Sequence, residues 1–379
     1  MRTVELAVIG AGPAGLAVAL EASQRGVETL ILDENAGPGG RLRQQVHSLV
    51  GAGRELARRR GFEVAREWSE EARRRGAEIW CGAQVWGIFQ GGAVEVYRGG
   101  RKEEVQARAI VLATGAAEEP AAFPGWTIPG IMNAGAVQGL LNLYGVLPGN
   151  RAVVYGTTDL GLVVAGELSR AGAEVTVVEP SAAVKGRALY ASPLQRWGVS
   201  VLTGVRMVGA RGQDRVEVVT LVREGGETRE VAADLVCLAA GFVPATELAG
   251  VVGCRQLLVP ALGGHVPVYD RALETTVEGL FVAGNAAGAD ELEAVILTGR
   301  LAGVSAAALL GRESPLQAER TAQETWTRIR QLSAGKAGRA RWAARERLIS
   351  NALAAQRRGL QGSGGQMRGF TKEEGSAGG

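Results

Sequence analysis

A glycine-rich segment near the start of the chain has the spacing of a dinucleotide-binding turn. Residues 10–15 read Gly-Ala-Gly-Pro-Ala-Gly, and they lie between an apolar run at 4–9 and a stretch of helical character. Glycines at this spacing permit a tight turn that brings bare backbone close to a diphosphate, and the helix that follows supplies oriented N–H groups. The pattern predicts a diphosphate site; the alternative is a glycine-rich turn without a ligand.

Acidic residues close the second apolar run at a distance that suits a ribose. Asp33 follows residues 29–32 and lies 18 residues after Gly15, where a carboxylate typically binds a ribose hydroxyl; the adjacent Glu34 is the alternative. Residues 39–41, Gly-Gly-Arg, come soon afterwards. They predict a further close approach of backbone to the ligand, with an ordinary surface turn as the alternative.

Two later apolar runs end in small residues. Ala113, Thr114 and Gly115 close one run, and Gly284 and Asn285 close the other. Because parallel sheets bind ligands at the carboxyl ends of their strands, both segments are expected beside the diphosphate site.

The chain repeats this organisation. An apolar run at 152–155 enters a second turn, residues 156–161, and another run at 175–178 ends in an acidic residue. Residues 235–241 then resemble residues 109–115, since both are apolar runs that enter Ala-x-Gly. The duplication predicts a second dinucleotide-binding-like domain inserted into the first.

The second turn departs from the first at its centre. Thr158 replaces the middle glycine, and a β-branched side chain there would crowd a diphosphate. The turn is therefore either a candidate NAD site or part of a degenerate domain kept for structure or partner contact. The candidate NAD contacts are Gly156, Thr157, Asp159, Leu160, Gly161 and Glu179.

As a set, the motifs resemble those of flavoproteins with two dinucleotide-binding domains, which bind FAD in an outer domain and usually NAD(P)H in an inserted one. A closer resemblance is to the sarcosine oxidase alpha-subunit-like branch, which includes subunits of hydrogen cyanide synthase and of opine and proline dehydrogenases. Residues 123–126, 130–138, 264–267 and 273–276 carry it, and it covers about residues 1–312.

The resemblance implies where FAD binds. In relatives, the N–H groups at the start of one helix point at the flavin; by the resemblance, the corresponding helix of this chain begins near Glu293 and Ala294. The implied FAD contacts are Gly10, Gly12, Pro13, Ala14, Gly15, Asp33, Glu34, Gly40, Arg41, Ala113, Thr114, Gly115, Gly284, Asn285, Glu293 and Ala294.

Two departures bear on the chemistry. Relatives of the thioredoxin reductase type carry a cysteine pair just before the second turn, but residues 131–138 contain no cysteine, which excludes a dithiol relay there. Where the family has Gly-Asp, this chain has Gly284 and Asn285, and a neutral amide bonds a hydroxyl less strongly than a carboxylate does. We therefore expect FAD binding that is weakened but retained.

The predicted architecture is α/β, with two Rossmann-like doubly wound domains and a helical C-terminal tail. An FAD-binding domain at 1–119 and 247–312 receives an NAD(P)-like domain at 120–246. The tail, 313–379, carries 12 Lys and Arg against 6 Asp and Glu. Ser314 and Pro315 open its first helix, a second helix is expected at 340–358, and the end from Gly359 has the composition of a disordered segment.

The function implied is that of an FAD-dependent oxidoreductase, the alpha-like subunit of an amine or amino-acid dehydrogenase complex. Its flavin would exchange electrons with NAD(H) or with a partner subunit; the alternative is a non-catalytic or electron-relay subunit with a degenerate nucleotide site. The expected partners are a second oxidoreductase subunit or further copies of the chain, and an amine or amino-acid substrate reached through the complex.

Several classes of function are not expected. No nucleic-acid-binding module is present, no metal-ligand cluster is recognisable, and no apolar run suggests a membrane span. Three unpaired cysteines and the absence of a signal-peptide layout favour a cytoplasmic location. The catalytic residues are unknown. His47, which follows the Gly-Gly loop, is a weak candidate, and His265 a weaker one.

Overall fold

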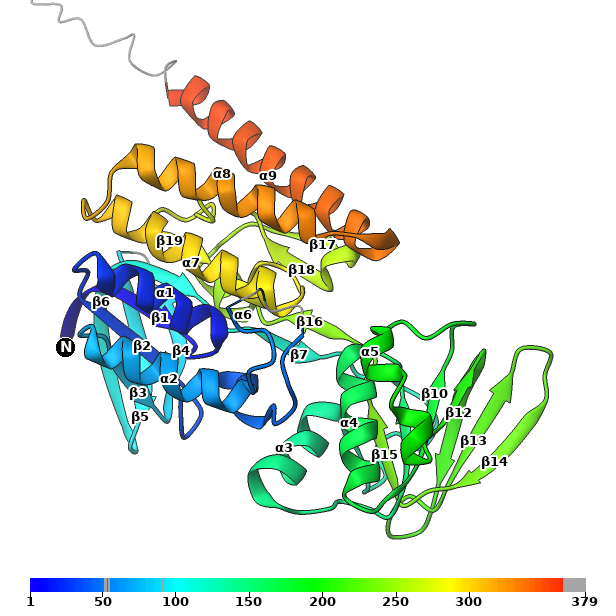
Figure 1. Ribbon diagram of the computed structural model, residues 1–379. Helices are drawn as coiled ribbons and strands as arrows, with labels where there is room; N and C mark the ends of the chain where they lie inside the picture. The colour runs from blue at the N-terminus through cyan, green and yellow to red at the C-terminus, as the bar shows by residue number, and fades with distance from the viewer. Residues whose placement is uncertain (51–52, 54, 90, 364–379) are drawn as a thin grey trace, which may run out of the picture.

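The computed structural model describes residues 1–50, 53, 55–89 and 91–363, with side chains described up to residue 352. Its two larger sheets lie beside each other, and α7, α8 and α9 stack over the first of them (Figure 1). The architecture is the predicted one, an α/β fold with two Rossmann-like sheets and a helical C-terminal region.

The first sheet has the strand order β3-β2-β1-β6-β5-β4, with β19 beside β6. β1 pairs in parallel with β2 and β6, and the apolar residues of these strands are buried. Gly82, with a positive φ of 61°, separates two consecutive strands of this sheet, β3 and β4. The strands are β1 (Arg2–Ile9), β2 (Thr29–Asp33), β3 (Glu78–Cys81), β4 (Ala83–Phe89), β5 (Ala93–Arg98), β6 (Arg101–Leu112) and β19 (Leu280–Val282).

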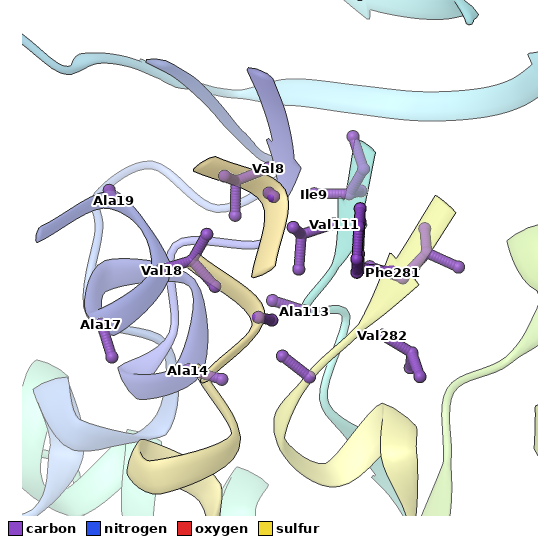
Figure 2. Close-up of a cluster of buried hydrophobic side chains, with 14 of the residues drawn as sticks. Val8, Ile9, Ala14, Ala17, Val18, Ala19, Val111, Ala113, Phe281 and Val282 are labelled. Carbon is purple, nitrogen blue, oxygen red and sulfur yellow. The ribbon is translucent and has the colours of Figure 1, made fainter. Parts of the chain in front are cut away.

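Helices α1 (Pro13–Gln24) and α7 (Leu292–Leu309) pack against this sheet and against each other. Figure 2 shows Ala14 and Val18 of α1 in the same buried cluster as Val111 and Phe281 of the sheet. Glycines on α7 permit the close helix contact, since a Cβ at Gly299 would lie 2.5 Å from the Ala14 carbonyl oxygen. The contact directs the N-terminus of α7 towards the first glycine turn. Further helices of this half are η1 (Gly40–Gln44), α2 (Gly61–Arg74) and η4 (Gly284–Ala287).

The second sheet is parallel, with the order β11-β10-β9-β15-β8. An antiparallel meander, β12-β13-β14, packs beside it; these strands lie between residues 180 and 234 and were not predicted from the sequence. The strands are β8 (Ile131–Asn133), β9 (Arg151–Tyr155), β10 (Glu174–Glu179), β11 (Ser200–Thr203), β12 (Val205–Arg211), β13 (Val218–Arg223), β14 (Thr228–Ala232) and β15 (Leu235–Leu238). The helices are α3 (Ala134–Tyr144), α4 (Asp159–Arg170), α5 (Ala188–Ala191) and η2 (Leu194–Trp197).

The chain crosses between the sheets on two short strands that pair with each other, β7 (Ala116–Glu118) and β16 (Phe242–Pro244). In Figure 1 they lie between the blue and the green parts of the molecule. Because both crossings occur there, we propose domain boundaries at 119/120 and 246/247. The chain then adds α6 (Glu247–Val251), β17 (Gln256–Val259), η3 (Pro260–Leu262) and β18 (Gly264–Pro267) before it returns to the first sheet with β19.

The tail forms two helices that dock on the first half. Ser314 caps α8 (Pro315–Leu332) by accepting a hydrogen bond from the Gln317 N–H at 3.1 Å. The second helix, α9 (Gly335–Ser363), begins earlier and ends later than the predicted 340–358. The disordered end predicted from Gly359 is therefore wrong as far as Ser363, and its remainder lies outside the described residues.

Helix α7 bears on the expectation that no apolar run suggests a membrane span. In the described part of the chain, it alone is long and apolar enough to cross a membrane by length and composition. However, 67% of that window is buried inside the protein, where it packs against α1 and α8. We interpret it as a core helix.

A buried ion pair fastens α9 to the start of α7. Arg345 is 1% exposed and bonds Asp290, which is 7% exposed. We expect Arg345→Met to lower the free energy of unfolding by about 3 kcal/mol, because the change removes the cation from one oxygen of a buried carboxylate and leaves Arg341 and the Glu291 N–H on the other. Urea unfolding tests this against Arg339→Met, an exposed change on the same helix that should cost less than about 0.5 kcal/mol. Equal costs would contradict the docking.

Candidate active-site cleft

A cleft of about 1290 Å³ opens between the two sheets, at the carboxyl ends of their central strands. A pocket for one drug-sized ligand measures roughly 300–1,000 Å³, so this cleft has room for a dinucleotide and a small substrate together. Both glycine turns, η1 and the N-terminus of α7 contribute to its walls. Its lining includes Gly12, Asp33, Gly40, His47, Gln138, Thr158, Arg187, Tyr190, Asn285 and Glu291.

The three glycines of the first turn have different tasks. A Cβ at Gly10 would lie 2.3 Å from the Ala113 carbonyl oxygen, and one at Gly15 would lie 1.8 Å from the Gly10 carbonyl oxygen. These two glycines are therefore required for the packing of the turn. At Gly12, by contrast, no atom of the described residues lies within 4 Å of the position that a Cβ would take. Gly12 is thus the glycine that leaves bare backbone facing the cleft.

Asp33 lies where the ribose acid was predicted and also supports the turn. It is 6% exposed, accepts a hydrogen bond from the Ala11 N–H at 2.6 Å, and accepts another from the Asn35 N–H at 2.8 Å. Each carboxylate oxygen has two lone-pair sites, so these bonds leave capacity for a ribose hydroxyl. Glu34 is exposed on the cleft rim.

The Gly-Gly loop covers the first turn, and its close approach to the ligand stays a prediction. The Gly39 N–H donates to the Ala11 carbonyl at 2.8 Å, and a Cβ at Gly40 would lie 2.9 Å from the Gly12 Cα. The Arg41 guanidinium instead reaches the crossing strands, where it donates to the Ala116 carbonyl and lies 3.3 Å from Glu118. The Ala116 carbonyl and Glu118 thus compete with FAD for the Arg41 side chain.

The remaining predicted FAD contacts divide into two groups. Pro13, Ala14, Ala113, Thr114, Gly115 and Asn285 line the cleft. Glu293 turns away to pair with Arg328 of α8 at 2.7 Å, and Ala294 is buried. Leu292 and Val295 line that part of the wall in their place.

The second turn copies the first in its structural contacts. Gly156 and Gly161 are needed for packing, since their Cβ atoms would each lie 2.4 Å from a carbonyl oxygen. The Thr157 N–H donates to Glu179 at 3.0 Å, as Ala11 does to Asp33. Burial by itself would raise the pKa of Glu179, but hydrogen bonds from Thr157, Ser181 and Lys185 lower it to about 2.

The positions that leave bare backbone in the first half carry side chains in the second. Thr158 stands where Gly12 does, and its hydroxyl caps α4 by accepting from the Gly161 N–H at 3.2 Å. Arg187 follows the loop that covers the turn, and it bonds the Val50 carbonyl at 2.7 Å and Glu291 at 2.5 Å. Asp159 and Leu160 also line the cleft. The second turn does not fit a dinucleotide unless Arg187 leaves the Val50 carbonyl and Glu291.

Functional candidates that sequence reasoning missed come from the second half. Glu167 on α4 and Tyr190 on α5 contact His47, and Gln138 on α3 donates to Glu167, but none of the three belongs to a recognisable motif. His265 is exposed and does not line the cleft. Cys81, Cys237 and Cys254 are free, and they do not line the cleft either.

This combination of two dinucleotide-binding-like sheets and a shared cleft defines a class, the two-domain nucleotide-dependent oxidoreductases. The family model for pyridine nucleotide-disulphide oxidoreductases matches residues 4–311. The chain belongs to this family and is an oxidoreductase; FAD and NAD(P) are the cofactors that the family uses.

Individual relatives agree with the predicted branch. An opine oxidase subunit of Agrobacterium tumefaciens (strain Ach5) is 32% identical over 367 residues, covering 88% of this chain and 71% of the relative. The alpha subunit of sarcosine oxidase from Rhizobium meliloti (strain 1021) is 31% identical over 77% of this chain but only 29% of its own length. The crystal structure of L-proline dehydrogenase from P. horikoshii has a TM-score of 0.67 and 24% identity, covering 85% of this chain and 59% of that one. The resemblance stated from the motifs is confirmed.

Two glycine variants should separate ligand binding from folding. Gly12→Ala is expected to keep the unfolding free energy of the FAD-free protein within about 1 kcal/mol, yet to weaken FAD binding at least about tenfold, because the methyl group points at open space in the cleft. Gly15→Ala should cost about 1–3 kcal/mol in stability, because the methyl group overlaps a carbonyl. Urea unfolding and FAD titration measure the two effects; unchanged FAD affinity in Gly12→Ala would contradict the assignment.

Glu179 should give the protein a measurable acid sensitivity. Its pKa is lowered from 4.5 to about 2 in the folded protein, so its stabilising contribution is complete above pH 4.5 and is lost as the pH falls towards 2. Glu179→Gln should be less stable than the parent at pH 7 and should lose less stability between pH 4.5 and 2. Unfolding measured across that range checks both statements; parallel curves for the two proteins would oppose them.

Proposed function

We propose that the protein is the FAD-binding, alpha-like subunit of an amine or amino-acid dehydrogenase complex. The observation that carries this proposal is the cleft in which Gly12 and Gly40 leave backbone bare beside Asp33 and Asn285. The relatives support the finer assignment, because the curated ones reported above are named as subunits of opine oxidase and sarcosine oxidase.

The residues present fit FAD. The first turn offers the N-terminus of α1 to the diphosphate, Asp33 offers carboxylate lone pairs to the ribose, and Asn285 stands at the start of η4 for the ribityl chain. When bound, FAD supplies a two-electron acceptor. The protein contributes position and the exclusion of water, and few reactive side chains are needed for that.

A dithiol relay is not part of the proposal. The three cysteines are free and do not line the cleft, and burial raises the pKa of the Cys237 thiol far above its ordinary value. Electrons therefore reach the flavin site directly from a substrate, from a partner subunit or from a pyridine nucleotide.

The side chains of the second turn favour an electron donor other than NADH. Thr158 and Arg187 fill the two places where the first half leaves backbone open, and Arg187 is held by Val50 and Glu291. The same observation supports the second candidate function, an electron-relay subunit whose inserted domain serves structure and partner contact.

Anaerobic reduction of the FAD-loaded protein distinguishes these functions. We expect the flavin absorbance to be lost on addition of an amine or amino-acid substrate, with the co-purified partner subunit present, and to change at least tenfold more slowly with NADH. Thr158→Gly alone should not restore rapid reduction by NADH, because Arg187 stays in place.

The controls are protein without FAD and the exposed variant Arg339→Met. Protein that takes up no FAD would contradict both functions. Rapid reduction by NADH alone would show that the second turn is a working nucleotide site, and would contradict the assignment of the donor.

A further inference from the structure

A groove of about 520 Å³ lies between the two tail helices. In Figure 1, α8 and α9 are close near their connection and diverge towards the C-terminal end of α9. Where the helices are close, Trp326 of α8 lies against Trp342 of α9, with 6.4 Å between the ring centroids. The groove shares no lining residue with the cleft between the sheets. It is lined by Arg271, Gln323, Trp326, Thr327, Arg330, Trp342, Glu346, Ile349 and Ser350.

The walls of this groove carry charges that are not paired within the described part of the chain. Arg271 and Arg330 form no ion pair with a described residue, and neither does Glu346, whereas three other arginines of the tail pair with acidic residues at the start of α7. Charged side chains in contact with water need no partner, so these three do not by themselves indicate a ligand. They determine which charges an occupant of the groove must carry.

The floor of the groove is apolar. Trp326 is 3% exposed and Ile349 is 7% exposed, while Trp342 is half-buried beside them. Indole rings pack favourably against other aromatic rings. An occupant that matches this groove therefore has an aromatic side chain for the floor, acidic groups for the two arginines and a basic group for Glu346.

The sequence that follows α9 has this combination of side chains. Residues 364–379 lie outside the described residues, and within them residues 370–374 read Phe-Thr-Lys-Glu-Glu. The phenylalanine is the only aromatic residue after Trp342. A lysine lies two positions after it, and two glutamates follow the lysine. The segment thus offers the ring, the base and the acids that the groove requires.

The chain is long enough to bring this segment back to the groove. Helix α9 ends at Ser363, and Ser350 in the groove lies 13 residues earlier, a distance of about 20 Å along a helix. The seven residues from Ser363 to Phe370 span up to about 23 Å when extended. Gly364 and Gly365 permit the chain to reverse direction, because glycine readily adopts the positive φ that other residues avoid.

The same distances place the charges of the segment. Lys372 lies nine residues after Ser363, up to about 30 Å when extended, and Glu346 lies 17 residues before Ser363, about 26 Å along the helix. The two glutamates after the lysine extend one or two residues further, towards the end of the groove near the connection of the helices. Arg330 lies at that end, close to the C-terminus of α8.

We propose that residues 370–374 return along α9 and bind in the groove between α8 and α9. The ring of Phe370 covers the apolar floor, Lys372 pairs with Glu346, and the two glutamates lie beside the unpaired arginines. The occupant is a segment of the same chain because a short tether gives it an effective concentration of about millimolar, which a separate molecule must exceed to compete.

Binding of the segment would stabilise one wall of the cleft from a distance. Helix α9 carries Arg341 and Arg345, and both pair with Asp290, which lines the cleft at the start of α7. A segment bound across α8 and α9 keeps these two arginines in place. The groove is therefore an intramolecular docking site for the end of the tail.

Carbodiimide cross-linking of the full-length protein, followed by peptide mass spectrometry, tests this register. The reagent joins an amine to a carboxylate that touches it, and the chain has only four lysines, at positions 102, 185, 336 and 372. We expect a link from Lys372 to Glu346 within one chain. In a mixture of isotope-labelled and unlabelled protein, a link between differently labelled chains would show that a second copy fills the groove and would overturn the intramolecular assignment. A link from Lys372 to a co-purified protein, or none at all, would overturn it as well.

Removing the aromatic ring should release the segment. Phe370→Ser is expected to abolish the Lys372 link and to speed amide hydrogen exchange in residues 342–352 about tenfold, because a buried aromatic ring is exchanged for a small polar group. The matched control is Ser376→Ala, which lies in the same part of the chain but outside the proposed contacts and should change neither readout. Unchanged exchange in Phe370→Ser would contradict the proposal.

A charge reversal with rescue distinguishes direct contact from an indirect effect on folding. Arg330→Glu should lower the yield of the link at least about threefold at low salt, since it places like charges together. Adding Glu374→Arg to the same protein should restore the yield. Arg347→Glu, an exposed change on α9 outside the groove, is the control and should have no effect. A yield that stays low in the double variant would show that the acidic pair does not meet Arg330.

Discussion

Close contact between backbone segments is the constraint on which this molecule depends. In each half a glycine turn lies so near the end of a neighbouring strand that an added Cβ would fall 2.3 or 2.4 Å from its carbonyl oxygen, whereas real Cβ contacts under 3.0 Å are essentially absent. The turns therefore keep their outer glycines whether or not a ligand binds. This contact places the first residues of α1 and of α4 at the sheet edge, and it creates the cleft between them.

The middle residue of each turn makes no such close backbone contact, and the two halves carry different residues there. Gly12 and Thr158 both begin a helix as its N-cap residue, so either is compatible with the fold. Only the glycine leaves the N-terminal N–H groups unobstructed; the threonine hydroxyl bonds one of them itself. The outer glycines and the acid that follows them are therefore weak support for nucleotide binding, because both halves have them. The residue at the middle of the turn is what distinguishes an open nucleotide site from a closed one.

Local patterns predicted most of the fold because the features that determine it are local. The two turns, the acids that end β2 and β10, and the cap of α8 by Ser314 each depend on residues within one strand–turn–helix unit or one helix end. The meander β12-β13-β14 was missed, since burial alternates along β12 and β13 and β14 is polar and mostly exposed, so none of the three is a fully buried apolar run. The location of His47 in the cleft could be anticipated from the Gly-Gly loop before it.

The partners of His47 could not be anticipated, because they come from a distant part of the sequence. Glu167 lies 120 residues further on, within a helix whose sequence predicts only an apolar face. Arg41 illustrates the same limit: its position favoured a ligand contact, but the crossing strands, which are distant in sequence, provide the Ala116 carbonyl and Glu118. Contacts between the halves depend on how the sheets are oriented, which single-sequence patterns do not encode.

Arginines of the basic tail form ion pairs with acidic residues at the start of α7. Arg328 of α8 pairs with Glu293, and Arg341 and Arg345 of α9 pair with Asp290. Acidic residues near a helix N-terminus are favoured by the helix dipole, so this acidic segment is stable in itself and also attracts the tail. Arg187 of the second half reaches Glu291 in the same segment. The start of α7 is therefore the point where the tail, the inserted half and the cleft meet, and three arginines of the tail serve docking within the chain.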